Sequence, residues 1–431
     1  MINFPESVIC VLRDDYENKT AAKLHLGKRT RLINTEVDVT FLFRSYESVQ
    51  AMYLFYSDIL NNTQEHFVIS LPIFGFKYKY VVRLESQMSW SSTIGKVGKM
   101  HAKLRIINEL KVMDSADFEM DINVLENKRS EKVKYWVETA GGGTIYTLGD
   151  DGYNKYNLEN GGQHIYAKGS NKFYGFGISR FKIEPNDEVH NVYIYKNNKQ
   201  VSAYNMFKEN NELVEIRADS SAFANVTKFE SFAQNALKLD YIDLFDTSNG
   251  TNFAYFLHYC RELSHIPLFD FSMGENFNSA FYGIRNVKRL PPFKFPNATY
   301  TRGIFNGMYL DGKQPAFYFP KTTSLTYAFN MPDQAGDIEL DITVDKRCWF
   351  GHCFSGVKGK LKVTMNTPAG SVYRMFEGVK TEGCLAGKLW TDVDTDNKED
   401  MFTNSNFSTP DDDIKDALMS ENGSVWEKDN C

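Results

Sequence analysis

Phenylalanine recurs at a nearly fixed spacing in the second half of the chain. Of its 33 Phe, 21 lie between residues 223 and 407. Two consecutive stretches show the repeating unit: YIDLFDTSNGTNFAYFLHYCRELS starts at Tyr241, and HIPLFDFSMGENFNSAFYGIRNVKR starts at His265. A first ladder of aromatic residues closes the successive units: Phe232, Phe256, Phe281, Phe305, Phe329, Phe350 and Phe376. A period of about 24 residues predicts a stack of units, none of which can bury its apolar face alone.

A second ladder follows the first in each unit, at Phe245, Phe269, Phe293, Phe317, Leu340, Leu361 and Leu389. Apolar residues alternate there, as in Phe269 and Phe271, which predicts a short strand with one buried side. Such strands would stack into a parallel sheet along one face of a solenoid. The residues between the inward pairs then face outward and are the candidate ligand-binding residues: Asp246, Asp270, Lys294, Tyr318, Asp341 and Lys362. Their chemistry varies between units, as expected of a recognition surface.

Alternating patterns also mark the first 110 residues. EVDVTFLF, HFVISLP, KYKYVVRLES and KMHAKLRIIN each predict a strand. Between the first two, RSYESVQAMYLFYSDIL places Val49, Met52, Tyr53 and Tyr56 at helical spacing after a candidate cap at Ser45. We therefore expect a compact α+β domain over residues 1–110.

The middle of the chain predicts a small antiparallel β domain over residues 115–220, because short aromatic strands alternate there with Gly, Asn and Asp clusters. VYIYKNNKQVSAY predicts a hairpin with its turn at Asn197 and Asn198. The triple glycine Gly141–Gly143 predicts a turn between strands. The solenoid covers residues 223–405, and the acidic residues 406–431 would cap it with one short helix. The expected fold class is thus mainly β with an α+β domain at the start.

Two parts of the chain resemble known families. DLFDTSNGTNFAYFLHYC followed by HIPLFDFSMGENFNSAFYG resembles the leucine-rich repeats of BspA-like bacterial surface proteins, in which Phe often closes the unit. The later segments GDIELDIT and GKLKVTM drift from that pattern. The resemblance covers seven units and implies a solenoid that binds a ligand or a cell surface, with no catalytic residues.

The first 108 residues resemble a family of bacteriophage tail proteins. The matching phrases, in order, are VLRDDYENK, KRTR, VDVTFLF, the Tyr53–Tyr56 helix, HFVISLPIFGFKYKYVVRL and KMHAKLRI. The Gly that the family has after Asp15 is absent, and so is a Trp-rich helix found in many members. The resemblance implies a domain that docks on the tail of a virion.

Composition narrows the function further. The chain has 49 basic and 55 acidic residues, so no net positive field favours nucleic-acid binding. MINFPESVICVLRDDYENK lacks the apolar core of a signal peptide, and no later stretch predicts a membrane-spanning helix. The six cysteines are too sparse for a disulfide scaffold. Cys348 and Cys353, beside His352, come closest to a metal pair, and the alternative is buried, reduced thiols.

Two motifs suggest a binding site, and each has a simpler structural interpretation. GMYLDGK at residues 307–313 satisfies G-x4-G-K, but Gln314 replaces the Ser or Thr of a phosphate-binding loop. WTDVDTDNKED resembles half of a calcium loop, with Asp392, Asp394 and Asp396 as a weak calcium candidate; a solvated acidic loop is the alternative.

Tyr318 and Trp349 are candidate exposed aromatics, each of which would offer a platform for a sugar or an apolar partner. An ordinary packed aromatic is an equal alternative for Tyr318 and the favoured interpretation for Trp349. No Ser, Cys or His arrangement predicts a nucleophilic site.

These observations together predict a non-enzymatic bacteriophage tail protein without a cofactor, made in the host cytoplasm and assembled into the virion. It would contact other tail proteins, form a homo-oligomer, and bind a host-surface protein or polysaccharide through the solenoid. The alternatives are a purely structural tail or baseplate protein, and a bacterial surface adhesin. A polysaccharide hydrolase lacks a supporting motif.

Overall fold

The computed structural model describes residues 116–150, 152–332, 336–379, 383–396 and 400–405, together with strands between residues 9 and 109 and at 425–428. The chain divides into two compact units. The first comprises Met1–Ala116, Ile145–Tyr156 and Lys168–Gly175, and the second comprises Asp117–Thr144, Asn157–Ala167 and Phe176–Cys431.

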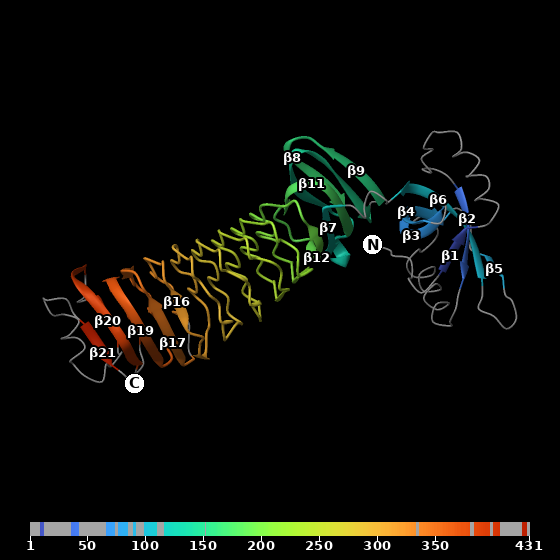
Figure 1. Cartoon of the computed structure of the whole chain (residues 1–431). Helices are drawn as coiled ribbons and strands as arrows, with labels where there is room; N and C mark the ends of the chain where they lie inside the picture. The colour runs from blue at the N-terminus through green and yellow to red at the C-terminus, as the bar shows by residue number, and fades with distance from the viewer. Residues whose placement is uncertain are drawn as a thin grey trace. The chain divides into compact units, whose positions relative to one another are not determined.

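The N-terminal region contains a six-stranded sheet (Figure 1). Its strands are β1 (Ile9–Leu12), β2 (Glu36–Leu42), β3 (His66–Ile73), β4 (Phe76–Leu84), β5 (Ser89–Ser91) and β6 (Lys99–Glu109). The order is β1-β2-β6-β4-β3, β5 also pairs with β6, and the pairs are antiparallel. The four predicted strands are confirmed. The predicted helix after Ser45 lies outside the described residues, so the α part of the expected α+β domain has no support.

Alternation explains the core of this sheet. Val39 and Phe41 of β2 are fully buried, and Val39 lies opposite Ala102 of β6. Leu104 of β6 is also buried, two residues further along the same face. Side chains of alternate strand residues point to the same face, so the apolar set lines one side of the sheet.

The middle region contributes to an eight-stranded sheet. It contains β7 (Phe118–Val124), the 3-10 helix η3 (Glu126–Lys128), β8 (Lys132–Gly149), β9 (Gly152–Leu158), β10 (Gly161–Lys168), β11 (Asn171–Ile183), β12 (Val189–Asn197), β13 (Glu215–Ala218) and β14 (Tyr241–Ile242). The order is β10-β8-β11-β7-β12-β13-β14, with β9 on β8. β12 pairs antiparallel with β7 but parallel with β13, which pairs parallel with β14. One sheet therefore leads from antiparallel strands into the parallel stacking of the repeats.

The predicted hairpin at Asn197 and Asn198 is wrong. Beyond the turn, Val201 donates its N–H to the carbonyl of Ser179 at 3.1 Å, and Ser202 bridges Arg180 in parallel. The buried Asn197 side chain accepts the N–H of Phe223 at 2.7 Å. Asn197 thus binds the backbone of a later segment, at Phe223, and does not close a hairpin between two strands.

The triple glycine does not form a turn either, because Gly141–Gly143 lies inside β8. A Cβ atom at Gly143 would lie 2.4 Å from the carbonyl oxygen of Phe176, and Gly142 has a φ of 85°. Glycine is required where another backbone approaches this closely and where a strand bends.

A β-solenoid of about seven turns follows, with a period of about 24 residues (Figure 1). One parallel bridge joins each turn to the next, through Ser202, Lys228, Asn252, Asn276 and Tyr300. Beyond each bridge, alternate N–H groups donate to carbonyls of the next turn, as Phe229, Ser231 and Ala233 do to Asn252, Ala254 and Phe256. The solenoid predicted from the Phe period is confirmed, and the turns begin near residue 202.

The last turns contain a seven-stranded sheet. Its strands are β15 (Gly312–Lys313), β16 (Phe317–Phe319), β17 (Ile338–Val344), β18 (Cys348–Trp349), β19 (Leu361–Ser371), β20 (Gly383–Asp396) and β21 (Val425–Lys428). The order is β15-β17-β19-β20-β21, with β16 on β17 and β18 on β19. All pairs are parallel except β20 with β21. The predicted capping helix lies outside the described residues. After it, β21 pairs along β20.

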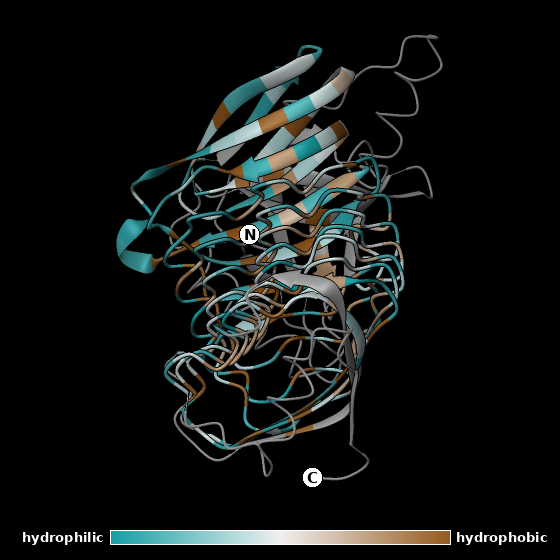
Figure 2. Ribbon diagram, turned by 90° about the vertical axis from the view of Figure 1, so that its left-hand side faces the viewer, coloured by the Kyte–Doolittle hydropathy of each residue, from teal (hydrophilic) through white to brown (hydrophobic). Residues whose placement is uncertain are grey.

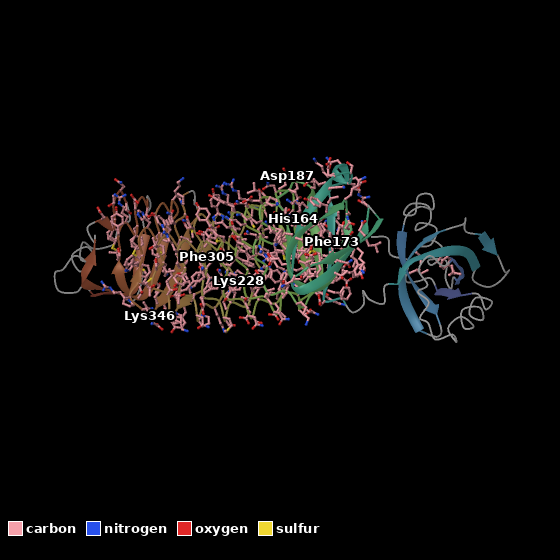
Figure 3. The ribbon with its side chains drawn as sticks, turned by 90° about the horizontal axis from the view of Figure 1, so that it is seen from above. His164, Phe173, Asp187, Lys228, Phe305 and Lys346 are labelled. Carbon is pink, nitrogen blue, oxygen red and sulfur yellow. The ribbon has the colours of Figure 1, made fainter. Side chains whose placement is uncertain are left out.

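Phenylalanine rings fill the interior of the coil. Phe229, Phe253 and Phe277 stack with centroids 5.2 and 5.3 Å apart and nearly parallel planes. Phe281 and Phe305 continue a second stack at 5.7 Å. Figure 3 shows Phe305 within the coil and Lys346 at its edge, and Figure 2 shows apolar and polar residues alternating along the turns. Aromatic stacking between turns thus forms the core.

The two predicted ladders have the right period but the wrong register in places. We call residues at equivalent positions of successive turns a column. The N–H of Phe281 donates to the carbonyl of Ile304, and that of Phe305 to the carbonyl of Ala328. These bonds align Phe256 with Ala280 and Ile304, in the column one residue before that of Phe281 and Phe305. The first ladder therefore mixed two neighbouring columns with Phe350, which lies in a third column beside Leu325; all of these residues are buried.

In the second ladder, the predicted partners differ from the observed ones by an even number of residues. Phe317 pairs with Ile342, and Leu340 pairs with Val363. A shift of two residues keeps a side chain on the same face of a strand, so the inward and outward assignment survived the error in register.

Replacing Phe293 with Ala should destabilise the solenoid by roughly 3–5 kcal/mol, because a buried ring would leave a cavity. The Phe293 side chain is 3% exposed, and its ring lies 5.1 Å from that of Phe271 and 5.7 Å from that of Phe281. Urea unfolding of the full chain measures the effect. Lys294→Ala, one residue away on the exposed side, is the control and should change stability by less than about 0.5 kcal/mol.

Candidate binding surfaces

The structure places the six predicted site residues on the outside of the coil. Asp270, Lys294 and Tyr318 are exposed, and Asp246, Asp341 and Lys362 are half-buried. They do not form a single row along the sheet. Tyr318 lies beside Thr343, Asp341 beside Thr364, and Lys362 beside Glu339. We call this surface, defined by those six residues, the variable face.

Several residues of the variable face already have intramolecular partners. A carboxylate oxygen of Asp246 accepts the N–H of Ser248, and one of Asp270 accepts the N–H of Ser272, both at 2.9 Å. The Tyr318 hydroxyl donates to the Asp345 carboxylate, and this hydrogen bond raises the pKa of Tyr318. The two aspartates therefore order local turns, which leaves Lys294 and the Tyr318 ring as the freest contact groups.

An exposed apolar column borders the variable face and was missed in the sequence. Leu244 is 51% exposed and Leu268 is 53% exposed. Pro292 and Ala316 continue the column at the same 24-residue spacing and are also exposed. These apolar residues recur two positions before each outward residue of the variable face. In the sequence they resemble core residues, because the surrounding repeat is itself rich in apolar residues.

Both candidate exposed aromatics are exposed, so the packed side chain that the sequence favoured for Trp349 is wrong. Tyr318 is 52% and Trp349 60% accessible. A Cβ atom at Gly370 would lie 2.7 Å from the Trp349 ring, so the absence of a side chain at Gly370 makes room for the indole.

A second surface, also missed in the sequence, carries aromatic rings and cations. It lies on the turn segments that follow each bridge, about half a repeat from the variable face. We call it the tyrosine stripe and define it by Tyr255, Tyr259, Tyr282, Tyr309, Tyr327 and Tyr373.

Ring contacts connect the stripe between turns. His258 stacks on Tyr282 at 4.8 Å, and Tyr259 meets Tyr282 edge-on at 4.9 Å. Further along, His352 stacks on Tyr327 at 4.8 Å and contacts Tyr373 at 5.4 Å. Each contact joins consecutive turns, so the stripe runs along the stacking direction.

Cations lie over the rings of the stripe. The guanidinium of Arg261 is 5.0 Å from the Tyr259 centroid, and that of Arg302 is 5.7 Å from the Tyr327 centroid. Arg285 and Lys288 both lie over Tyr309, at 5.2 and 5.4 Å. Cation–π contacts of this kind favour fixed orientations of both groups.

Most of the residues that the sequence suggested as metal or phosphate ligands have a structural role in the fold. Cys348 and Cys353 are buried, which raises the pKa of Cys348 to about 12 and that of Cys353 well above its usual value. His352 lies instead beside Glu377, with Nδ1 3.0 Å from Oε2. Both thiols are free and buried, in agreement with the alternative of buried, reduced thiols. Among the described residues no three His, Cys, Asp or Glu gather as metal ligands.

The G-x4-G-K motif is part of the solenoid framework. Gly312 and Lys313 form β15, paired with β17, and Lys313 binds Glu339 at 3.0 Å. Gln314 is buried and bonds the backbone of two turns. Asp392, Asp394 and Asp396 belong to β20, so an extended strand replaces the expected loop.

The molecule was also compared with known proteins. No family model matches the chain, and searches of curated proteins and of solved structures return no match. Among the described residues no helix is long and apolar enough to span a membrane.

Replacing Gln314 with Ala should cost about 1–3 kcal/mol, because buried backbone groups would lose their partners. Its side-chain oxygen accepts the N–H of Leu290 at 3.0 Å, and its amide donates to Lys288 and Asp311 at 3.1 and 2.9 Å. Lys313→Ala, which removes a mostly exposed ion pair, is the control and should change the free energy of unfolding by under about 1 kcal/mol. Equal losses in both variants, measured by urea unfolding, would contradict this role for Gln314.

His258 should make the stability of the protein depend on pH. Burial lowers the pKa of His258 from 6.5 to about 4. Between these two values the unfolded chain binds the proton and the folded chain does not, so stability falls as the pH drops through that window. Because the ring is partly exposed, solvent screening reduces the loss to about 1–2 kcal/mol. Urea titrations at pH 7 and pH 4 should show this extra loss in the native chain but not in His258→Gln.

Proposed function

We propose that the chain is a non-enzymatic adhesion protein whose solenoid presents the variable face to a host-surface component. The observation that carries this proposal is the contrast between the two sides of the coil. Phe293 and Phe317 occupy equivalent buried positions in successive turns, whereas the neighbouring outward residues are Lys294 and Tyr318. A constant interior with a varied exterior is the arrangement of repeat proteins that bind ligands.

The finer assignment rests on the resemblances in the sequence. We propose that the repeats are leucine-rich repeats of the BspA-like type, and that the N-terminal region docks the protein on a bacteriophage tail. Several copies on one virion would multiply weak contacts through effective concentration. A protein built in this way needs only modest affinity for each copy.

A structural role in the tail is the second candidate. The exposed column of Leu244, Leu268, Pro292 and Ala316 favours it, because a row of apolar side chains beside the variable face suits a contact with another protein. In this case the solenoid would bind a virion protein instead of a host.

Binding of the purified full chain to host cells tests the first candidate. The double change Lys294→Gln with Tyr318→Ala should lower the cell-bound fraction about tenfold, since a few central side chains dominate most interfaces. Lys228→Gln, an exposed lysine in the bridge column, is the control and should bind as the native chain does. Native binding by the double variant would show that the variable face is not the adhesive surface.

The second candidate predicts a different result from the same proteins. Leu244→Asp with Leu268→Asp should leave cell binding intact but prevent incorporation into tails, because two buried charges would be placed in an apolar contact. Electron microscopy of the assembled particles measures incorporation. Loss of cell binding together with normal incorporation would favour adhesion over the structural role.

A further inference from the structure

The tyrosine stripe places bulky residues where the backbone favours glycine. Tyr255, Tyr259 and Tyr327 have φ values of 57°, 60° and 59°. At the corresponding positions of other turns φ is also positive, and the residues there are Gly283, Gly303 and Gly307 as well as Ser231, Asn235, Ser279, His352 and Arg374. The left-handed region costs a side-chain-bearing residue about 1–2 kcal/mol, so glycine would be the more stable choice.

At Tyr255, burial of the side chain does not offset the free-energy cost of the left-handed backbone. Its side chain is 40% exposed, and its ring contacts His258 at 5.3 Å edge-on. The left-handed conformation recurs in most turns, so the repeat itself fixes it. At Tyr255 this conformation carries an exposed aromatic ring where glycine would also fit.

The positive charges beside the rings indicate that a ligand of the stripe is negatively charged. Arg261 and Arg302 are both exposed, lie over Tyr259 and Tyr327, and form no ion pair with a described residue. A planar guanidinium stacked on a ring still offers its edge donors to a carboxylate, sulfate or phosphate in two-pronged geometry. The stripe therefore combines partly exposed tyrosine rings with exposed guanidinium groups that can bind an anion.

The geometry of the solenoid points to a linear ligand. Successive turns of paired backbone lie about 4.8 Å apart, and the stacked rings of His258 and Tyr282 follow that spacing at 4.8 Å. A compact ligand would use one or two turns, whereas tyrosines that recur along the turns from Tyr255 to Tyr373 suit an extended chain. A sugar polymer matches this pattern, because its C–H groups can pack on the accessible parts of the rings while its acidic groups reach the arginines.

We propose that the tyrosine stripe is a binding site for a linear polyanionic glycan. This goes beyond the proposed function, because it concerns a different surface and holds whether or not the variable face binds a host. Single-stranded nucleic acid also uses aromatic and basic side chains. The glycan is favoured because nucleic-acid bases need free ring faces for stacking, and His258 and His352 already stack on Tyr282 and Tyr327.

Calorimetric titration of the full chain with four polymers tests the proposal. Polygalacturonate and dextran sulfate, which carry carboxylates and sulfates, should bind, and neutral dextran and oligo-deoxythymidine should bind at least tenfold more weakly. The stronger of the two anionic polymers identifies the source of the charge. Raising the salt concentration should weaken the interaction, since it depends on charge. Equal binding of neutral dextran, stronger binding of the oligonucleotide, or no binding of either polyanion would overturn the proposal.

Variants locate the site and separate binding from folding. Tyr255→Gly should weaken polyanion binding at least tenfold while leaving the melting temperature unchanged or higher, because it removes a ring and relieves backbone strain. Arg261→Gln should weaken binding to a similar extent, with Arg261→Lys intermediate because it keeps the charge but loses the planar fork.

Tyr318→Ala is the matched control, an exposed tyrosine on the variable face, and should bind the polyanions as the native chain does. If Tyr255→Gly and Arg261→Gln bind normally, the stripe is not the site. If Tyr318→Ala loses polyanion binding as they do, the two surfaces are not separate and the proposal fails. Loss of cell adhesion in Tyr318→Ala with normal polyanion binding separates the proposed function from this inference.

Discussion

Stacking of phenylalanine rings between successive turns is the interaction on which the solenoid depends. Each turn exposes apolar rings on both of its sides, and a single turn covers neither. Phe253 lies between Phe229 and Phe277, with nearly parallel rings on both sides. The rings also set the period, since the backbone N–H groups of one turn reach the carbonyls of the next only when the rings are in register.

Ring stacking constrains the residues inside the coil but not those on its outer surface. The outer surface carries two different sets of side chains, the variable face and the tyrosine stripe. On the variable face, Lys294 and Tyr318 alternate with buried residues and have no positive φ, so other side chains are tolerated there at little cost. On the tyrosine stripe, Tyr255, Tyr259 and Tyr327 have left-handed backbone, which makes these three positions costly for a side chain. The two surfaces therefore differ in how freely their side chains can be replaced.

Much of the fold could be predicted because its signals are local or periodic. The alternation of Val39 and Phe41 identified a strand, and the Phe period identified the solenoid. Errors arose where long-range pairing decided the outcome. Asn197 reads as a turn residue, yet its side chain binds the backbone of Phe223. Gly143 reads as a turn, yet it is required by the approach of Phe176. Neither partner is near in sequence, so no local pattern contains them.

The sequence by itself determined the period of the repeat and which residues face inward, because both follow from the spacing of apolar side chains along one chain. Tertiary structure alone decided the register between turns and the position of the tyrosine stripe. Phe281 and Phe256 look equivalent in the sequence, but hydrogen bonds between turns place them in different columns. The stripe depends on the same bonds, since left-handed residues interrupt the alternation and turn Tyr255 and Tyr259 outward in a way that no strand or helix period describes.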